Sequence, residues 1–303
     1  MINLRHIKFL VIIIFSLLLS SQSFADKKFE KDLKKISKDN GFIDNFGNIY
    51  SDDKITDKSK TILIIYTHGG MGDQTLDKCL KKWNLVAPVI RNLHDKRINN
   101  YQIKIYRLCT GVRGWSKAEQ DKMWKSTSKK RLTLKNSEGE LLFHKVKDFL
   151  RIKIIKAKID QFKSDGFENI VLAGHSMGGW ASLKFKTIHP NLIEGSIGLH
   201  PGSGGTKKNR KDWPWWEEVR NYGFGNLSNL NALIVTHDKD NFNSPDDYSM
   251  FKNLTEVKFV NITSSECKKK ATLGGYHGLA LTKCFADKDP KSKEIAKYLE
   301  EIF

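Results

Sequence analysis

Proline is scarce in this sequence, and so are the features that divide a chain into modules. Six prolines occur in 303 residues, with no internal repeat and no stretch rich in proline, glycine and serine. Such a composition does not require a second domain. The length suffices for one large domain with a full hydrophobic core. We therefore expect a single folded domain over residues 26–303.

A long hydrophobic run is also missing. The main apolar stretch, from Phe9 to Leu19, is roughly half of the ~20 residues that a membrane-spanning helix needs. It follows the basic residues Arg5 and Lys8 and is followed by small and polar residues up to Ala25. This order is typical of a secretory signal peptide. We predict cleavage after Ala25 and a secreted or periplasmic protein, with a membrane anchor as the alternative.

Cysteine is rare, with four residues in the whole chain. Pairs with C-x2-C spacing are absent, which argues against a zinc site, and we expect no metal. An even number of cysteines in an exported protein suggests two disulfides, which can be drawn in three pairings. We predict the sequence-adjacent pairs, Cys79–Cys109 and Cys267–Cys284, and four free buried thiols are the alternative.

Acidic residues are under-represented, with 34 against 52 lysines and arginines and a net charge of +18. A basic surface favours anionic partners, such as phospholipid headgroups or acidic polysaccharide. The lysines, however, are spread along the whole chain, and no recognisable nucleic-acid-binding module is present. We expect a solvated basic surface and no specific nucleic acid, with an anionic envelope surface as the alternative partner.

Apolar runs and helical patterns alternate along the chain. Continuous or alternating apolar runs predict strands at 61–67, 101–108, 169–173, 193–199, 232–236 and 256–262. The sequence pattern predicts helices at 83–93 (interrupted by Pro88), within 111–140, and at 141–164 and 290–302. A further helix can start at 179–183 and is ended by His189-Pro190. Residues 26–48 predict a poorly ordered lead-in with one short helix. Alternating strands and helices indicate a mostly parallel sheet covered on both faces.

The most specific motif is the pentapeptide Gly174-His175-Ser176-Met177-Gly178, between an apolar run and a helical pattern. This is the G-x-S-x-G arrangement of a nucleophile elbow, a strand, sharp turn and helix with serine at the apex. We expect a Cβ atom at Gly174 or Gly178 to collide with the neighbouring strand or helix. The turn lifts the Ser176 hydroxyl above the sheet and points the first amides of the helix at the atom that it attacks.

Three further motifs stand where a serine nucleophile needs them. They are the His-Gly-Gly turn at 68–70, the aspartates after the strand at 232–236, and the Gly-Tyr-His-Gly segment at 275–278. Together with the elbow, they make residues 60–303 resemble the α/β-hydrolase superfamily and its exported esterases and lipases. The resemblance implies a mostly parallel central sheet with helices on both faces and a small cap-like insertion at about 201–230.

The family order of nucleophile, acid and histidine assigns Ser176, then Asp240 or Asp238, then His277. The histidine takes the proton of the serine, and the carboxylate orients the imidazole and stabilises its protonated form. The family turn usually has a glycine three residues before the acid. This register selects Asp240, but His237 occupies the glycine position and leaves Asp238 as the alternative.

The resemblance also implies an oxyanion hole. The amide of Met177 supplies one donor, and the amide of Gly70 or Met71 supplies the second. His277 is the preferred base because it follows the last strand, is flanked by glycines and precedes an apolar helical run. The other histidines of the motifs and strand ends are expected to be structural: His68, His175, His189 and His200.

Three tryptophans fall within four residues, Trp213, Trp215 and Trp216. They form either a cap wall that binds substrate or packing for an irregular loop. We predict an exported serine hydrolase that needs no cofactor and cleaves a small-molecule, acyl or polysaccharide ester through an acyl-enzyme. The alternatives are a peptidase, amidase or acyltransferase with the same triad, or a non-catalytic binding protein of the cell envelope.

Overall fold

The computed structural model describes residues 41–43, 49–50, 55–70, 72, 76–80, 84–211, 216–262, 267 and 275–303. The predicted signal segment and its cleavage point lie outside these ranges, as do Met71, Trp213 and Trp215. Within the described ranges, no helix combines the length and the apolar character needed to cross a bilayer.

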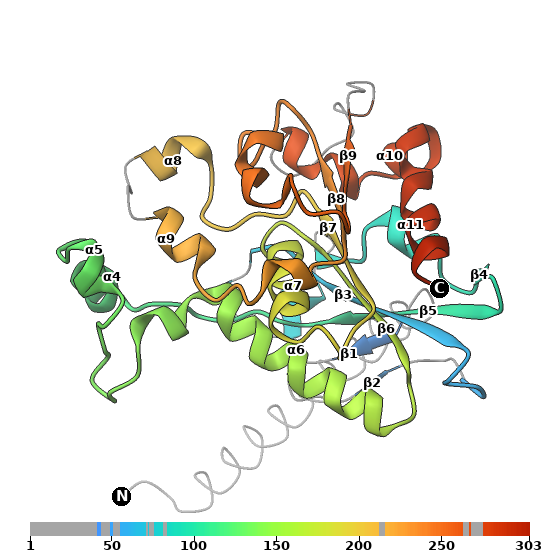
Figure 1. Cartoon of the computed structure of the whole chain (residues 1–303), viewed down its shortest axis with the longest axis horizontal. Coiled ribbons are helices and arrows are strands. Elements are labelled where there is room, and N and C mark those ends of the chain that lie inside the picture. Colours follow the sequence, from blue (N-terminus) through green and yellow to red (C-terminus); the bar gives the residue numbers. More distant parts are fainter. Residues whose placement is uncertain are drawn as a thin grey trace, which may run out of the picture.

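One sheet of nine strands runs through the centre of the described structure (Figure 1). The strands are β1 (Gly41–Ile43), β2 (Ile49–Tyr50), β3 (Thr61–Thr67), β4 (Arg97–Ile98), β5 (Tyr101–Leu108), β6 (Asn169–His175), β7 (Gly195–Leu199), β8 (Ala232–Thr236) and β9 (Val257–Asn261). Their order across the sheet is β2-β1-β5-β3-β6-β7-β8-β9, and β4 pairs with β5. Two pairs, β1–β2 and β4–β5, are antiparallel, and the other pairs are parallel.

The long apolar runs form the strands expected of them. The predicted strands at 61–67, 101–108 and 232–236 match β3, β5 and β8 residue for residue. The prediction for the lead-in is wrong at residues 41–43, which form a strand parallel to the end of β5. The strands β1 and β2 have only three and two residues, too few for an alternating pattern to be recognised.

Helices cover both faces of the sheet, which confirms the predicted fold class. On one face, α6 (Lys147–Ser164) and α7 (Met177–Ile188) pack against alternate residues of β3 and β6, such as Leu63 and Leu172. On the other face, α3 (Pro88–Arg91), α10 (Lys283–Lys288) and α11 (Glu294–Ile302) pack against the intervening residues, such as Ile64. Successive side chains of a strand point to opposite faces, so one buried strand supplies both cores.

Three predicted helices begin later than the periodicity suggested. The helix expected at 83–93 is only the short α3, which begins at Pro88, because proline fits the first helical position and not the interior. Short 3-10 turns, η2 (Leu142–Lys145) and η7 (Pro290–Lys293), precede α6 and α11. The elbow helix α7 ends at Ile188, as predicted.

Four short helices lie together on one side of the molecule (Figure 1). The polar segment 111–140 carries α4 (Lys117–Trp124) and α5 (Ser128–Arg131), and the segment 201–230 carries α8 (Lys207–Lys211) and α9 (Trp216–Asn221). A small separate core joins α4 to α9 through Met123, Phe143 and Val219. The insertion expected at 201–230 is therefore helical and packs against the segment that precedes α6.

Both predicted disulfides are present. Cys79, at the end of α2 (Leu76–Cys79), is bonded to Cys109 directly after β5, with 5.7 Å between the Cα atoms. Cys267 is bonded to Cys284 of α10, with 5.4 Å between the Cα atoms. The described chain contains no free cysteine, so the alternative of four free thiols is wrong.

Candidate active site

Ser176 stands at a strained turn between β6 and α7. Its backbone angles are φ 52° and ψ −122°, and a positive φ is uncommon for a residue with a side chain. Hydrogen bonds hold the turn, because the Ser176 amide donates to the Leu199 carbonyl at 3.0 Å and the Trp180 amide donates to the Ser176 carbonyl at 2.9 Å. The side chain is half-buried. The backbone therefore presents the serine hydroxyl at the carboxyl end of the sheet.

The two glycines of the motif are required by close packing. A Cβ atom at Gly174 would lie 2.5 Å from the carbonyl carbon of Gly178. A Cβ atom at Gly178 would lie 2.3 Å from the carbonyl oxygen of Thr67 and 2.4 Å from that of His68. These distances confirm the collision with neighbouring strand and helix that the sequence predicted.

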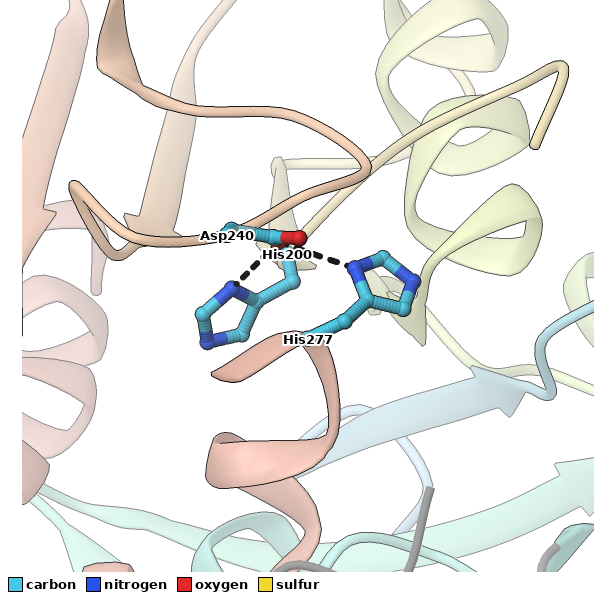
Figure 2. A group of neighbouring side chains, drawn as sticks. All are labelled: His200, Asp240 and His277. Atoms are coloured by element: carbon cyan, nitrogen blue, oxygen red, sulfur yellow. Dashed lines mark hydrogen bonds and ion pairs between the residues drawn. The ribbon is translucent and has the colours of Figure 1, made fainter. Parts of the chain in front are cut away.

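Asp240 and His277 are in direct contact (Figure 2). The Nδ1–H of His277 donates to Oδ2 of Asp240 at 2.9 Å, and both side chains are buried. Asp238, in contrast, is exposed and accepts a hydrogen bond from the Asn261 amide at 2.7 Å. Of the two candidate acids, the structure thus brings Asp240, and not Asp238, to the histidine.

A second histidine shares the same carboxylate oxygen. Nδ1 of His200 donates to Oδ2 of Asp240 at 3.0 Å, and the His200 side chain is fully buried (Figure 2). Burial alone would raise the pKa of Asp240, but the hydrogen bonds from His200 and His277 outweigh it and hold that pKa well below its usual range. Asp240 therefore stays ionised at neutral pH.

His200, Asp240 and His277 also satisfy the spacing of a metal site, since each offers a ligand atom within 4.8 Å of the others. The two Nδ1 atoms, however, are hydrogen-bond donors to one carboxylate oxygen, and a nitrogen that carries a proton cannot bind a metal. The arrangement is that of a carboxylate held between two imidazoles. Sequence reasoning placed His200 at a strand end but missed its contact with the acid.

Ser176 and His277 line one cavity of about 330 Å³. Nε2 of His277 is buried and has no hydrogen-bond partner among the described residues, and the ring of Phe242 stacks on the imidazole with 4.1 Å between centroids. The structure records no direct hydrogen bond from Ser176 to His277 in the described chain. Contacts of this kind often tighten only when substrate binds.

The glycine turn at 68–70 borders the same cavity. Gly69 and Gly70 line it beside Met177, the first residue of α7, whose amide has no partner within the helix. His68 is buried behind the turn, donates from Nδ1 to the Gly69 carbonyl at 2.8 Å and accepts at Nε2 from the Thr110 amide at 3.1 Å. His68 is therefore a neutral hydrogen-bonding residue of the turn, in the structural role that the sequence predicted for it.

Two further predicted residues support the site, and one of them, His175, also lines the cavity. Nε2 of His175 donates to the backbone carbonyl of His277 at 2.8 Å, which ties the elbow to the histidine loop. Trp216 does not line the cavity; its indole N–H donates to the Ser203 carbonyl at 3.0 Å. A Cβ atom at Gly204 would lie 1.8 Å from the Trp216 ring. Trp216 thus supports the glycine-rich wall formed by residues 202–205.

The buried histidines predict a steep loss of stability below neutral pH. Burial lowers the pKa of His68, His175 and His200 below the usual value. The unfolded chain takes up these protons near pH ~6.5, whereas the folded protein does not. The free energy of unfolding is therefore highest above that pH. Below it, each histidine lowers the free energy of unfolding by up to ~1.4 kcal/mol per pH unit, and the three together by about 4 kcal/mol per pH unit.

Urea unfolding at pH 7.5, 6.5 and 5.5 measures this slope, above the range in which most carboxylates titrate. In the His175→Gln variant, which carries no titrating group at that position, we expect the slope to decrease by up to ~1.4 kcal/mol per pH unit. A free energy of unfolding that stays constant from pH 7.5 to 5.5 contradicts the assignment of these histidines as neutral in the folded protein.

No family model and no curated protein matches the chain. Solved structures do match. Est1E from Butyrivibrio proteoclasticus has 16% identity and a TM-score of 0.44, over 80% of this chain and 87% of that chain. A lipase-esterase related protein from Clostridium acetobutylicum has 11% identity and a TM-score of 0.42, over 82% and 97%. A monoacylglycerol lipase from Paleococcus ferrophilus has 13% identity and a TM-score of 0.42, over 80% and 96%. Identities this low transfer neither a substrate nor a residue role.

Proposed function

We propose that this chain, whose fold is that of the α/β-hydrolases, is an exported serine hydrolase that cleaves carboxylic esters. One observation carries the proposal. The imidazole of His277, which donates to Asp240, lines the same cavity as the strained Ser176 and the glycine turn. A nucleophile, a base with its orienting carboxylate and two sources of amide donors thus border one cavity, and this is the set of groups that acyl transfer needs.

Acylation begins when Oγ of Ser176 attacks the ester carbonyl carbon while Nε2 of His277 takes the hydroxyl proton. The carbonyl oxygen becomes an oxyanion that accepts hydrogen bonds from the amides of Met177 and Gly70. The tetrahedral intermediate then collapses, the carbon–oxygen bond to the alcohol breaks, and His277 returns the proton to the departing alkoxide. The acyl group is left on Ser176.

Deacylation repeats these steps with water. His277 takes a proton from a water molecule, whose oxygen attacks the acyl carbon, and the same amides stabilise the second oxyanion. When this intermediate collapses, the bond to Oγ breaks and the proton on His277 returns to Ser176. The carboxylic acid leaves and the enzyme is restored.

Asp240 has two effects on this cycle. Its hydrogen bond keeps the proton of His277 on Nδ1, so that Nε2 is free to accept. Its negative charge stabilises the imidazolium that forms in each half-reaction. Because the pKa of Asp240 is held low by the hydrogen bonds that it accepts, the carboxylate remains charged throughout the pH range in which an imidazole acts as a base.

The cavity favours small substrates. Its volume of about 330 Å³ is at the lower end of the ~300–1,000 Å³ range of small-molecule sites. We therefore propose short acyl groups, ahead of the long chains of a lipase or a polysaccharide ester. An alkoxide leaves more readily than an amide anion, and an ester carbonyl is less stabilised by resonance than an amide carbonyl, so an ester makes a smaller demand on the triad than an amide does. The two disulfides support an oxidising compartment, as the predicted signal segment does.

The proposal is tested with p-nitrophenyl esters from acetate to dodecanoate beside the matched p-nitroacetanilide. We expect kcat/KM for acetate or butyrate to exceed that for dodecanoate by at least about 10-fold and that for the anilide by more than about 100-fold. These ratios correspond to differences in activation free energy of about 1.4 and 2.7 kcal/mol. Equal rates for ester and anilide favour an amidase. Saturable binding of esters by the folded protein with no turnover favours a binding protein and contradicts the proposal.

A further inference from the structure

We propose that Arg151, on α6, is a positioning residue. It holds the oxyanion turn, which is the His-Gly-Gly turn at 68–70, in the orientation that catalysis requires. The inference rests on the proposed function and deepens it, because it concerns how the second amide donor of that site is aimed. No feature of the sequence marks Arg151, which is one of several basic residues along the α6 pattern.

The contacts of Arg151 are with the backbone of the turn. Its side chain is fully buried. Nη1 donates to the carbonyl oxygen of His68 at 2.7 Å, and Nη2 donates to the carbonyl oxygen of Gly69 at 2.7 Å. Hydrogen bonds from a charged donor are shorter and roughly twice as strong as those between neutral groups. One guanidinium thus holds two consecutive peptide groups of the turn.

These two bonds determine where the amides of the turn point. In a trans peptide the carbonyl of one residue and the N–H of the next lie in one plane and point in opposite directions, and the described chain has no cis peptide. A Gly69 carbonyl directed at Arg151 therefore directs the Gly70 N–H away from α6. Gly69 and Gly70 both line the cavity beside Ser176, so the N–H on the far side of this peptide is the donor that the oxyanion needs.

The turn needs such a restraint because it consists of glycines. Glycine adopts left-handed and right-handed backbone conformations with nearly equal ease, so the peptide between Gly69 and Gly70 has little intrinsic preference for one orientation. A rotation of this peptide by half a turn would place its carbonyl where the N–H should be. Arg151 opposes that rotation together with His68, because the rotated peptide would leave Nη2 of the buried cation and Nδ1 of His68 without their shared acceptor, the Gly69 carbonyl.

A buried ion pair near Arg151 joins α6 to the elbow helix. Asp148, three residues before Arg151 on α6, accepts a hydrogen bond from Lys184 of α7 at 2.6 Å, and both of these side chains are fully buried. Lys184 also donates to the Tyr222 carbonyl at 2.6 Å. The helix α6 therefore contacts α7, which begins with the donor Met177, and also the turn that carries the second donor.

Packing alone does not explain the guanidinium. Burial lowers the pKa of Arg151 to about 10, and the nearby Asp148 carboxylate opposes that shift. Burying a charged group costs free energy that an apolar side chain of similar length would not incur, so an apolar side chain would fill this space at least as well. What an apolar side chain lacks is the pair of donors directed at the turn.

The test compares two variants. Arg151→Met removes both donors, and Arg151→Lys keeps the positive charge but lacks the planar guanidinium that donates to two carbonyls at once. With the best p-nitrophenyl ester, we expect kcat to fall about 100-fold in the methionine variant, as after loss of an oxyanion donor, and about 10-fold in the lysine variant. KM should stay within about 3-fold, because the turn acts on the transition state. Lys153→Met, at an exposed position of the same helix, should change neither constant by more than about 2-fold.

A trifluoromethyl ketone inhibitor separates positioning from a merely structural role. Its adduct with the serine carries an oxyanion, so its inhibition constant should rise in the same ratio as kcat/KM falls across the variants. A structural defect would instead lower the number of active sites and leave the inhibition constant of the remaining sites unchanged. If Arg151→Met does not fold, the same comparison is made with Arg151→Lys: its inhibition constant should rise by the factor by which its kcat/KM falls.

Two failures are distinguishable. Wild-type protein that hydrolyses the ester, together with a folded Arg151→Met variant of unchanged kcat or unchanged ketone affinity, overturns the role of Arg151 alone. Folded wild-type protein that hydrolyses no ester overturns the proposed function and, with it, the role of Arg151.

Discussion

Replacing Ser176 by alanine is expected to lower ester hydrolysis by about 10⁶-fold, to the small residual rate that the amide donors and substrate binding provide. The change removes the only atom that we assign as nucleophile and leaves the base and the amide donors in place. Alanine is smaller than serine and tolerates the turn no worse, so the fold should persist. The measurement is kcat for the best p-nitrophenyl ester, with circular dichroism to confirm that the variant is folded.

Ser203 provides a matched control. It lines the same cavity and is buried, but it follows β7 in the glycine-rich wall and is not at the apex of a strained turn. Ser203→Ala should therefore keep kcat within a few-fold of the wild type. Activity above about 1% in Ser176→Ala, or a comparable loss in Ser203→Ala, contradicts the assignment of the nucleophile.

Replacing Asp240 by asparagine is expected to lower kcat by about 10⁴-fold. The asparagine side chain presents an amide that can donate toward His277, which would move the imidazole proton from Nδ1 to Nε2 and remove the base. It also removes the charge that stabilises the imidazolium. Asp238→Asn is the matched comparison, because Asp238 is exposed and bonded to Asn261, and it should change kcat by less than about 2-fold.

The two variants are compared at one pH near 8 with the same ester. Equal losses in the two variants, or a larger loss in Asp238→Asn, contradict the role of Asp240. The comparison also tests the register of the turn after β8, which the sequence left open between these two aspartates.

Local signals made the elbow, the central strands and the disulfides predictable. A side chain at Gly174 or Gly178 would collide with the adjoining helix or strand. Any sharp strand–turn–helix of this kind brings these segments together, so the motif alone predicts the collisions. The buried parallel strands are continuous apolar runs, which sequence periodicity detects well. For the acid, the sequence left two candidates, Asp240 and Asp238. The choice between them depends on the contact of Asp240 with His277, which forms only in the tertiary structure.

The residues that the sequence did not indicate act across long separations. His200 reaches Asp240, 40 positions later in the chain, only because β7 and β8 are neighbours in the sheet. Arg151 is a basic residue in an amphipathic pattern and contacts a turn more than 80 positions earlier. Helical periodicity predicts neither contact, since it indicates which face of a helix is apolar and not what a polar side chain on that helix meets.

The triad is tested most directly by labelling the folded protein with a fluorophosphonate probe and locating the adduct by mass spectrometry. The probe reacts with serines that a neighbouring base has activated. The account predicts a single adduct, on Ser176, that is lost in Ser176→Ala and strongly reduced in His277→Ala. A folded protein without an adduct, or with an adduct on another residue, contradicts it.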